Sequence, residues 1–173
     1  MRVGIFGGSF NPVHEGHLKL AKEALSELNL DRVIFVPSNQ NPLKKATGLM
    51  SSAQRVARLE KALKGKPGFS VDLREMRRKG PSFTVDTLKS FKEEFGKKAV
   101  LYFLAGADAL VDFHRWKSPE QILKLCRFAV FSRPGVRAAG RAPEGVLKIP
   151  MEAAAISSTQ IRKRSRSSNS SLK

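Results

Sequence analysis

Two patterns of hydrophobic and polar residues follow each other along the chain. Short apolar runs bounded by polar or turn-forming residues predict buried strands. These runs are Arg2–Phe6, Arg32–Val36, Phe69–Leu73, Lys98–Ala105, Arg127–Ser132 and Val146–Ile149. Between them, apolar residues recur at helical spacing among charged ones, which predicts amphipathic helices. These segments are Glu15–Asn29, Ser51–Leu63, Thr84–Phe95, a helix that begins at Ser118-Pro119, and Ser157–Arg162.

Strands that alternate with helices predict an α/β fold in which a doubly wound parallel sheet carries helices on both faces. A single domain is expected over residues 1–162. Residues 163–173 are rich in serine and arginine without apolar periodicity, so a flexible tail is expected there. Ligands of such sheets bind beyond the carboxyl ends of the strands. One shared crevice is therefore expected to collect four loops, which follow Phe6, Val36, Leu104 and Ser132.

Several predicted helices begin with residues that suit a cap. Ser51 with Gln54 has the spacing of a capping box, and Ser157 with Gln160 repeats it. Ser118 is expected to be an N-cap before a proline at the first helical position.

Charge narrows the classes of partner. The chain has 32 basic and 15 acidic residues, a formal net charge of +17. Such a balance attracts polyanions, and charge alone does not choose between nucleic acid and nucleotide phosphates. No basic stripe interleaved with aromatic residues is visible, so no specific nucleic-acid binding is expected.

The cysteine content and the hydropathy of the chain indicate its cellular compartment. Cys126 is the only cysteine, which excludes an intramolecular disulfide, and its apolar setting favours a packed thiol over a reactive one. No apolar stretch approaches the roughly 18 residues that span a membrane. The N-terminus turns glycine-rich at Gly7 and Gly8, too early for a signal peptide. We therefore expect a cytoplasmic protein without membrane contact.

The segment from Gly7 to His17 carries the strongest chemical signal. It joins the first strand to the first helix, where glycines allow a phosphate to approach the backbone and free N–H groups favour negative charge. His14 and His17 are three residues apart, so both fit on one side of the first helical turn, where imidazoles can stabilise developing charge. A simple turn or a metal site is the alternative. Only His114 remains as a further histidine, so a phosphate site is favoured and no metal site is expected.

The chain resembles the nucleotidyltransferase superfamily that carries a His-x-Gly-His motif. In this chain the motif reads His14-Glu15-Gly16-His17. A second superfamily motif is similar to residues 156–162, which read Ile-Ser-Ser-Thr-Gln-Ile-Arg. Three further segments resemble nicotinate mononucleotide adenylyltransferases: residues 78–88, residues 106–116 and Ser132-Arg133-Pro134-Gly135. The resemblance runs from residue 1 to about residue 162, and it implies a Rossmann-like sheet.

The resemblance implies three sets of site residues. The catalytic set is His14, His17 and Arg162. The ATP-binding set is Gly7, Gly8, Ser9, Phe10, His14, His17, Lys44, Gly106, Asp108, Ser157, Ser158, Thr159 and Arg162. The set for nicotinate mononucleotide is Asn39, Phe83, Thr84, Asp108, Trp116 and Arg133.

Other interpretations of these residues remain open. Lys44 is equally well explained as a solvated lysine, Trp116 as a core aromatic and Thr84 as an N-cap. The chain also departs from the family pattern. Asn41 and Leu43 stand where proline and histidine are usual, and Phe83 stands where tyrosine is common. Beyond the second motif the family usually continues with an apolar segment, and here the basic tail stands in its place.

The implied reaction is direct displacement. The phosphate of nicotinate mononucleotide attacks the α-phosphorus of ATP, pyrophosphate leaves, and Mg²⁺ is held mainly by the ATP phosphates. The rivals are a phosphopantetheine or nicotinamide mononucleotide adenylyltransferase and, in another class, a nucleic-acid-binding module that kept the fold. The sequence leaves open whether the chain is a monomer or a homo-oligomer.

Overall fold

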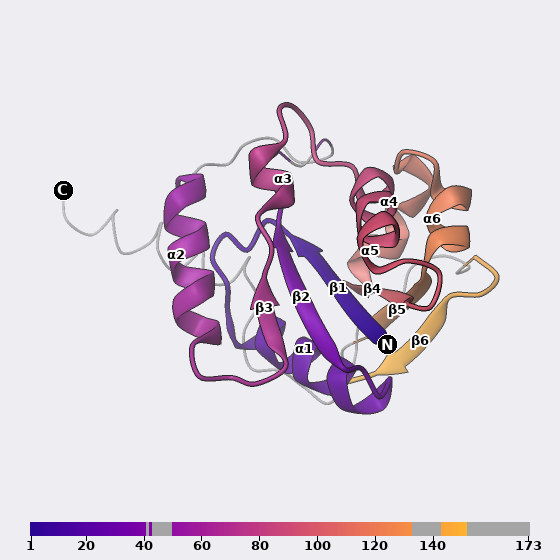
Figure 1. Ribbon diagram of the computed structural model, residues 1–173, viewed down its shortest axis with the longest axis horizontal. Helices are drawn as coiled ribbons and strands as arrows, with labels where there is room; N and C mark the ends of the chain where they lie inside the picture. The colour runs from indigo at the N-terminus through magenta and orange to yellow at the C-terminus, as the bar shows by residue number, and fades with distance from the viewer. Residues whose placement is uncertain (41, 43–49, 133–142, 152–173) are drawn as a thin grey trace.

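A computed structural model of the chain describes residues 1–40, 42, 50–132 and 143–151, and Figure 1 shows their arrangement. Six strands of this part form one sheet in the order β3-β2-β1-β4-β5-β6, and every neighbouring pair is parallel. The strands are β1 (Arg2–Gly8), β2 (Arg32–Pro37), β3 (Phe69–Val71), β4 (Val100–Gly106), β5 (Arg127–Ser132) and β6 (Leu147–Pro150). The predicted α/β fold with a parallel sheet is confirmed.

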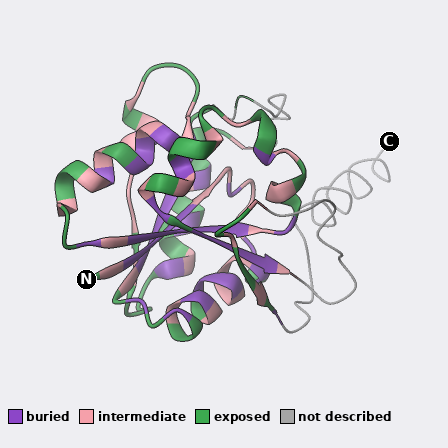
Figure 2. Cartoon of the chain, turned by 90° about the vertical axis from the view of Figure 1, so that its right-hand side faces the viewer, coloured by how far each residue is buried: buried purple, intermediate pink, exposed green. Residues whose placement is uncertain are grey.

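Helices lie on both faces of this sheet, as predicted. They are α1 (Glu15–Glu27), α2 (Ser52–Leu63), α3 (Arg74–Arg77), α4 (Thr84–Phe95), α5 (Asp108–Val111), the 3-10 helix η1 (Phe113–Arg115) and α6 (Pro119–Leu125). Alternate residues of a strand point to opposite faces, so each strand supplies two cores. Val3 and Ile5 of β1 pack with residues of α4 and α6, whereas Phe6 packs with residues of α1 and α2. Buried residues accordingly concentrate along the strands (Figure 2).

The order of the strands indicates where a ligand would bind. From β1 the chain moves outward through β2 to β3, returns to β4 on the other side of β1, and continues to β5 and β6. The direction of winding therefore reverses between β1 and β4. Open parallel sheets bind ligands at such a switch point, beyond the carboxyl ends of the strands. In this chain, Gly8 and Gly106 end the two strands concerned.

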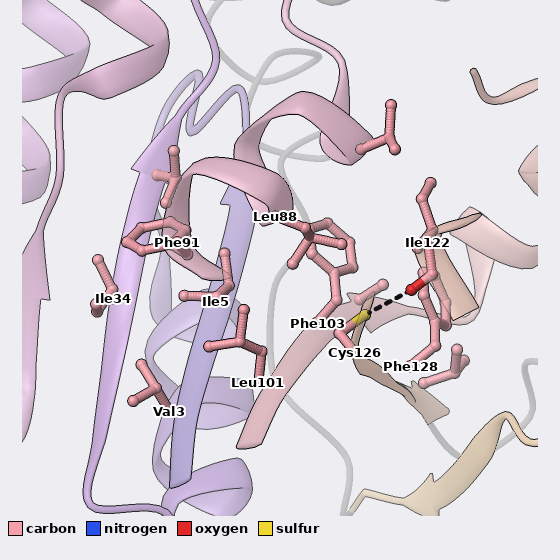
Figure 3. Close-up of a cluster of buried hydrophobic side chains, with 14 of the residues drawn as sticks. Val3, Ile5, Ile34, Leu88, Phe91, Leu101, Phe103, Ile122, Cys126 and Phe128 are labelled. Carbon is pink, nitrogen blue, oxygen red and sulfur yellow. Dashed lines mark hydrogen bonds between the residues drawn. The ribbon is translucent and has the colours of Figure 1, made fainter. Parts of the chain in front are cut away.

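Cys126 lies in the core on the α4–α6 face (Figure 3). Its thiol donates to the carbonyl oxygen of Ile122, 3.3 Å away. Burial raises the pKa of this thiol to about 12. The prediction of a packed thiol is confirmed.

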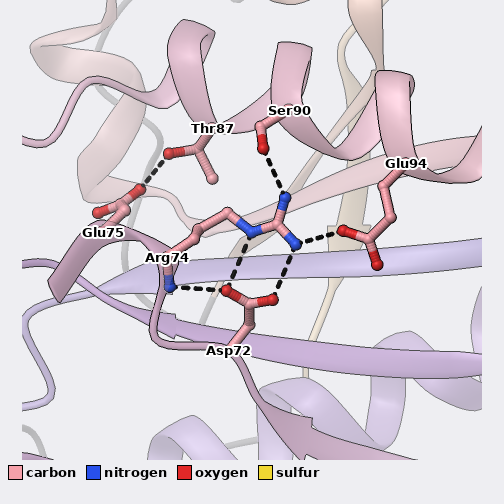
Figure 4. Close-up of polar contacts among 6 residues, drawn as sticks. All are labelled: Asp72, Arg74, Glu75, Thr87, Ser90 and Glu94. Carbon is pink, nitrogen blue, oxygen red and sulfur yellow. Dashed lines mark hydrogen bonds and ion pairs between the residues drawn. The ribbon is translucent and has the colours of Figure 1, made fainter. Parts of the chain in front are cut away.

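A polar cluster fastens α3 to β3 and α4 (Figure 4). The Arg74 guanidinium donates to Asp72 at 2.8 and 2.9 Å, to Ser90 Oγ at 2.9 Å and to Glu94 at 2.6 Å. It also lies over the Phe91 ring, 3.4 Å from the centroid. Burial alone would raise the pKa of Asp72, but the hydrogen bonds and charge of Arg74 outweigh burial and lower it.

Capping and element boundaries depart from the predictions at several points. The capping box at Ser51 is confirmed, since Ser51 Oγ accepts from the Gln54 N–H and Gln54 Oε1 accepts from the Ser51 N–H. Ser118 occupies the N-cap position of α6 before Pro119, as predicted, but it has a left-handed φ of 52° and its side chain makes no capping hydrogen bond. Thr84 is the first residue of α4, and Phe83 occupies the cap position. Helices α3, α5 and η1 were not predicted. Within the described residues, no helix is long and apolar enough to cross a membrane.

Candidate active site

The loop after β1 is built around a buried phenylalanine. Phe10 adopts a φ of 43° and buries its ring to 1% exposure against Phe6 and Phe35. A Cβ at Gly8 would lie 3.1 Å from this ring, so glycine at that position lets the ring fold beneath the loop. The Phe10 side chain is therefore an anchor of the loop. The predicted contact of Phe10 with ATP could then come only from its backbone.

His14 and His17 form the capping box of α1. The N-cap His14 accepts the Gly16 N–H through Nδ1 at 3.1 Å, and His17 accepts the His14 N–H through Nδ1 at 3.2 Å. Because Nδ1 is the acceptor in both rings, the ring proton lies on Nε2, and Nε2–H is the donor end of each imidazole. The backbone thereby sets the tautomer of both side chains.

Aromatic contacts hold the second histidine in place. The His17 ring lies against His14, with centroids 3.8 Å apart, and its other neighbours are Phe10 at 5.1 Å and Phe6 at 5.9 Å. His14 is 9% exposed and His17 is half-buried. The two imidazoles are thus fixed side by side at the positive end of a helix, where an anion is favoured.

Gly106 ends the central strand β4, and Asp108 lies two residues beyond it. Asp108 begins α5 and is exposed, and a Cβ at Gly106 would lie 2.7 Å from its Oδ1 atom. Glycine at this strand end therefore lets the carboxylate fold back over β4. A carboxylate in that position can accept hydrogen bonds from hydroxyl groups of a ligand.

The loop after β2 is fastened to the segment that precedes α4. The Asn39 N–H donates to Ser82 Oγ at 3.1 Å, Asn39 Nδ2 donates to the Arg78 carbonyl at 3.3 Å, and the Ser82 N–H donates to the Gln40 carbonyl at 2.8 Å. Asn39 itself is exposed, and Phe83 and Thr84 are half-buried. The structure therefore brings together three of the residues predicted to hold the mononucleotide.

Trp116 lies beyond η1, half-buried at the edge of the α4–α6 core. Its ring meets Phe103 edge-on at 5.7 Å, Phe113 at 5.5 Å and Phe128 at 6.0 Å. The core interpretation of Trp116 thus holds for part of its ring. Trp116 is only partly buried, so packing and ligand contact are compatible.

Two buried charged residues of the site region were not predicted. Glu75 of α3 accepts from Thr87 Oγ1 at 2.6 Å (Figure 4) and is hydrogen-bonded by Ser82. Burial raises the pKa of the Glu75 carboxyl, while those hydrogen bonds and the charge of Arg78 act against the rise. The other residue is Arg55 of α2, which is 6% exposed. Its position four residues before Leu59 puts it on the apolar stripe of α2, a signal that was available in the sequence.

Six predicted site residues lie outside the described residues, namely Lys44, Arg133, Ser157, Ser158, Thr159 and Arg162. The substituted positions Asn41 and Leu43 lie there too. Among the residues that are described, no group of three His, Cys, Asp or Glu side chains is placed to hold a metal ion.

Comparison with known proteins assigns the family. The cytidylyltransferase-like family matches residues 5–164. A probable nicotinate-nucleotide adenylyltransferase of Thermoanaerobacter sp. is 39% identical over 175 residues, which cover 95% of this chain and 82% of the relative. A probable nicotinate-nucleotide adenylyltransferase of Aquifex aeolicus is 45% identical over 136 residues, 79% of either chain. The chain belongs to the nicotinate-nucleotide adenylyltransferases of the cytidylyltransferase-like family.

The fold of this adenylyltransferase also has solved counterparts. The nicotinic acid mononucleotide adenylyltransferase of Plasmodium falciparum, complexed with NaAD, superposes with a TM-score of 0.67 at 17% identity. The match covers 92% of this chain and 78% of the other. This adenylyltransferase therefore has the Rossmann-like α/β fold that its sequence predicts. Its paired imidazoles and glycine-bounded strand ends lie at the switch point of that fold, where an anion is favoured.

Proposed function

We propose that this adenylyltransferase transfers the adenylyl group of ATP to nicotinate mononucleotide, which gives nicotinate adenine dinucleotide and pyrophosphate. The observation that carries the proposal is the histidine pair that caps α1, because its tautomer presents two N–H donors at a helix N-terminus. The names of the relatives at about 40% identity support the choice of substrate.

The reaction proposed is an in-line displacement without a covalent intermediate. The mononucleotide phosphate attacks the α-phosphorus of ATP, the new P–O bond forms, and the bond to pyrophosphate breaks. His14 and His17 donate through Nε2–H to phosphate oxygens that gain charge, and the N–H groups of the loop after β1 add further donors. Asp108 accepts from ribose hydroxyls of the nucleotide. Catalysis then consists of positioning and charge stabilisation.

Mg²⁺ fits this donor set as a companion of ATP. The described site offers N–H donors and the Asp108 carboxylate, and no group of three His, Cys, Asp or Glu side chains there is placed to hold a metal ion, so phosphate oxygens and water would supply most of the ligands that Mg²⁺ needs. When bound, the ion neutralises charge on the leaving pyrophosphate.

The test is pyrophosphate release from ATP and Mg²⁺, with nicotinate mononucleotide, nicotinamide mononucleotide and phosphopantetheine measured in parallel. Release that depends on the nicotinate form by at least about tenfold in kcat/KM supports the proposal. Equal or greater release with another acceptor would overturn the substrate. Absence of release with every acceptor from folded protein, together with salt-sensitive binding of duplex DNA, would favour the nucleic-acid module.

A further inference from the structure

Arg55 is a buried charge whose described partners are all neutral. Its Nη1 atom donates to the Ser9 carbonyl at 2.7 Å and to the Ser38 carbonyl at 2.9 Å, and Nη2 donates to Ser52 Oγ at 3.1 Å. Within the described part of the chain, no carboxylate lies within ion-pair distance of it. Burial lowers the pKa of the guanidinium, which is the effect of desolvation. A buried ion without a counter-charge is costly, and an apolar side chain would fill this position on α2 at less cost.

The two carbonyl groups that Arg55 holds belong to the two substrate loops. Ser9 lies in the loop after β1, which carries the histidine motif, and Ser38 begins the loop after β2, which carries Asn39. A single nitrogen atom bonds to both carbonyls, so a shift of one loop disturbs the hydrogen bond to the other. The Ser38 N–H also donates to the Gly8 carbonyl at 2.9 Å, which joins the same two strand ends.

Holding a carbonyl also orients the N–H group of the same peptide. The two groups of a trans peptide point in opposite directions. Arg55 therefore turns the Phe10 N–H and the Asn39 N–H away from α2. The Asn39 N–H donates to Ser82 Oγ, and Ser82 in turn is hydrogen-bonded to the buried Glu75. Peptide 38–39 is thus held from both sides.

We propose that Arg55 is a positioning residue that sets the ATP loop and the mononucleotide loop together from beneath the site. The phosphates of the bound nucleotides supply the negative charge that its described surroundings lack. The assignment of the two loops to their substrates rests on the proposed function.

The test compares Arg55→Lys with Arg58→Lys, because Arg58 lies on the same helix and is exposed. Lysine keeps the charge but cannot reproduce the fork of three hydrogen bonds. We expect Arg55→Lys to raise KM for ATP and KM for nicotinate mononucleotide together, and to lower kcat/KM by about tenfold to a hundredfold, since small displacements at a site cost that much. Arg58→Lys is expected to leave all three constants within about twofold, as exposed substitutions usually do.

A purely structural role gives a different result. It would lower the folded fraction, and therefore the apparent kcat, with both KM values unchanged, and this outcome would overturn the proposal. A rise in only one of the two KM values would also overturn the proposal. Ser52→Ala is the milder second variant, because it removes one anchor of the guanidinium without touching either loop. It is expected to raise both KM values by about twofold to fivefold, in line with the loss of one hydrogen bond.

Binding measurements separate this proposal from the proposed function. Calorimetric titration of wild type and Arg55→Lys with a non-hydrolysable ATP analogue, and separately with nicotinate mononucleotide, requires no turnover. Weaker binding of both ligands by the variant supports the positioning role even where no pyrophosphate is released. Unchanged binding of either ligand that the wild type binds contradicts it. If the wild type binds neither ligand, both the proposed function and the assignment of the two loops to their substrates are contradicted.

Discussion

The His14 and His17 rings lie with their centroids 3.8 Å apart, and each accepts a backbone N–H of the first turn of α1 through Nδ1. One pair of side chains thus caps the helix and fixes its own tautomer. An Nδ1 atom that accepts a backbone N–H carries no proton, so each ring that caps α1 donates from Nε2. The helix start and the proposed phosphate site therefore depend on the same two residues.

The capping and catalytic parts of His14 can be separated by substitution. Asparagine is a good N-cap, since its side-chain oxygen can accept the Gly16 N–H, but it lacks an N–H at the position of Nε2. We expect His14→Asn to lower kcat by about a hundredfold or more, as loss of a transition-state donor does. Its free energy of unfolding should stay within about 0.5 kcal/mol of wild type. Pyrophosphate-release kinetics and urea denaturation measure the two quantities.

His14→Ala provides the comparison. It removes the cap as well as the donor, so a further loss of about 1 kcal/mol of stability is expected at a similar kcat. If His14→Asn keeps wild-type turnover, the imidazole has no part in the reaction and serves the helix alone.

The sheet and the first motif could be predicted because local pattern determines them. The strand runs that begin at Arg2, Arg32 and Arg127 are apolar and short, and the two glycines that end β1 mark where the chain turns. In contrast, α3, α5 and η1 have only one turn each, too short for apolar periodicity to appear. Tertiary contacts hold such turns, as Arg74 does for α3 through Asp72 and Glu94.

The buried charged residues of the site region could be predicted only in part, for a related reason. Helical spacing places Arg55 on the apolar stripe of α2, but an arginine there can still be solvated, and it is the contacts with the loops after β1 and β2 that bury it. The burial of Glu75 likewise depends on Thr87 and Ser82, which arrive from α4 and its preceding loop. Local sequence carries little information on hydrogen-bond partners that lie so far away along the chain. The left-handed conformation of Ser118 also depends on its surroundings, because serine before proline suits an ordinary N-cap.

The Arg74 cluster is expected to stabilise the fold. Arg74→Ala removes the guanidinium donors from the Asp72 carboxylate, which keeps the backbone N–H of residue 74, and exposes the Phe91 ring, so the free energy of unfolding should fall by about 2 kcal/mol. Glu94 is half exposed, at 52%, and Glu94→Gln should cost less than about 0.5 kcal/mol. Chemical denaturation compares the variants. Arg77→Ala, at an exposed position of the same helix, is the matched control, and a loss as large as that of Arg74→Ala would show that the positive charge near Asp72, and not the Arg74 hydrogen bonds, explains the effect.

Glu75 makes stability depend on pH. Its pKa is raised in the folded protein, so the folded state binds the proton more tightly than the unfolded chain does. The resulting stabilisation is complete below the unfolded pKa of about 4.3 and is lost as the pH rises through the folded pKa. Glutamine carries no charge at any pH. We therefore expect the free energy of unfolding of Glu75→Gln, relative to that of wild type, to be higher at pH 8 than at pH 4. Urea denaturation at the two pH values measures this difference.

Glu93→Gln is the control for this comparison, since Glu93 is exposed on α4 and should show no such dependence. A pH dependence of the same size in both variants would assign the effect to net charge and not to the buried carboxyl.

Cys126 should be unreactive in the native protein. Burial raises the pKa of its thiol to about 12, so almost no thiolate forms at pH 8, and the surrounding core blocks access. We expect no reaction with a chromogenic disulfide reagent in buffer and one thiol per chain in denaturant, because the chain has a single cysteine. Equal rates in buffer and in denaturant would contradict the buried position.

Trp116 packs in the aromatic cluster and is proposed to contact the mononucleotide as well, and we expect kinetics to separate the two contributions. Trp116→Leu keeps an apolar side chain against Phe103 and Phe113 but removes the indole face. We expect KM for nicotinate mononucleotide to rise by about fivefold to tenfold, the value of one aromatic contact, and KM for ATP to change by less than about twofold. Phe113→Leu is the matched control, because Phe113 is 3% exposed and packs in the same aromatic cluster. It should lower stability and leave the ratio of the two KM values unchanged. If both variants shift that ratio alike, the cluster shapes the site through packing, and Trp116 does not stack on the pyridine ring.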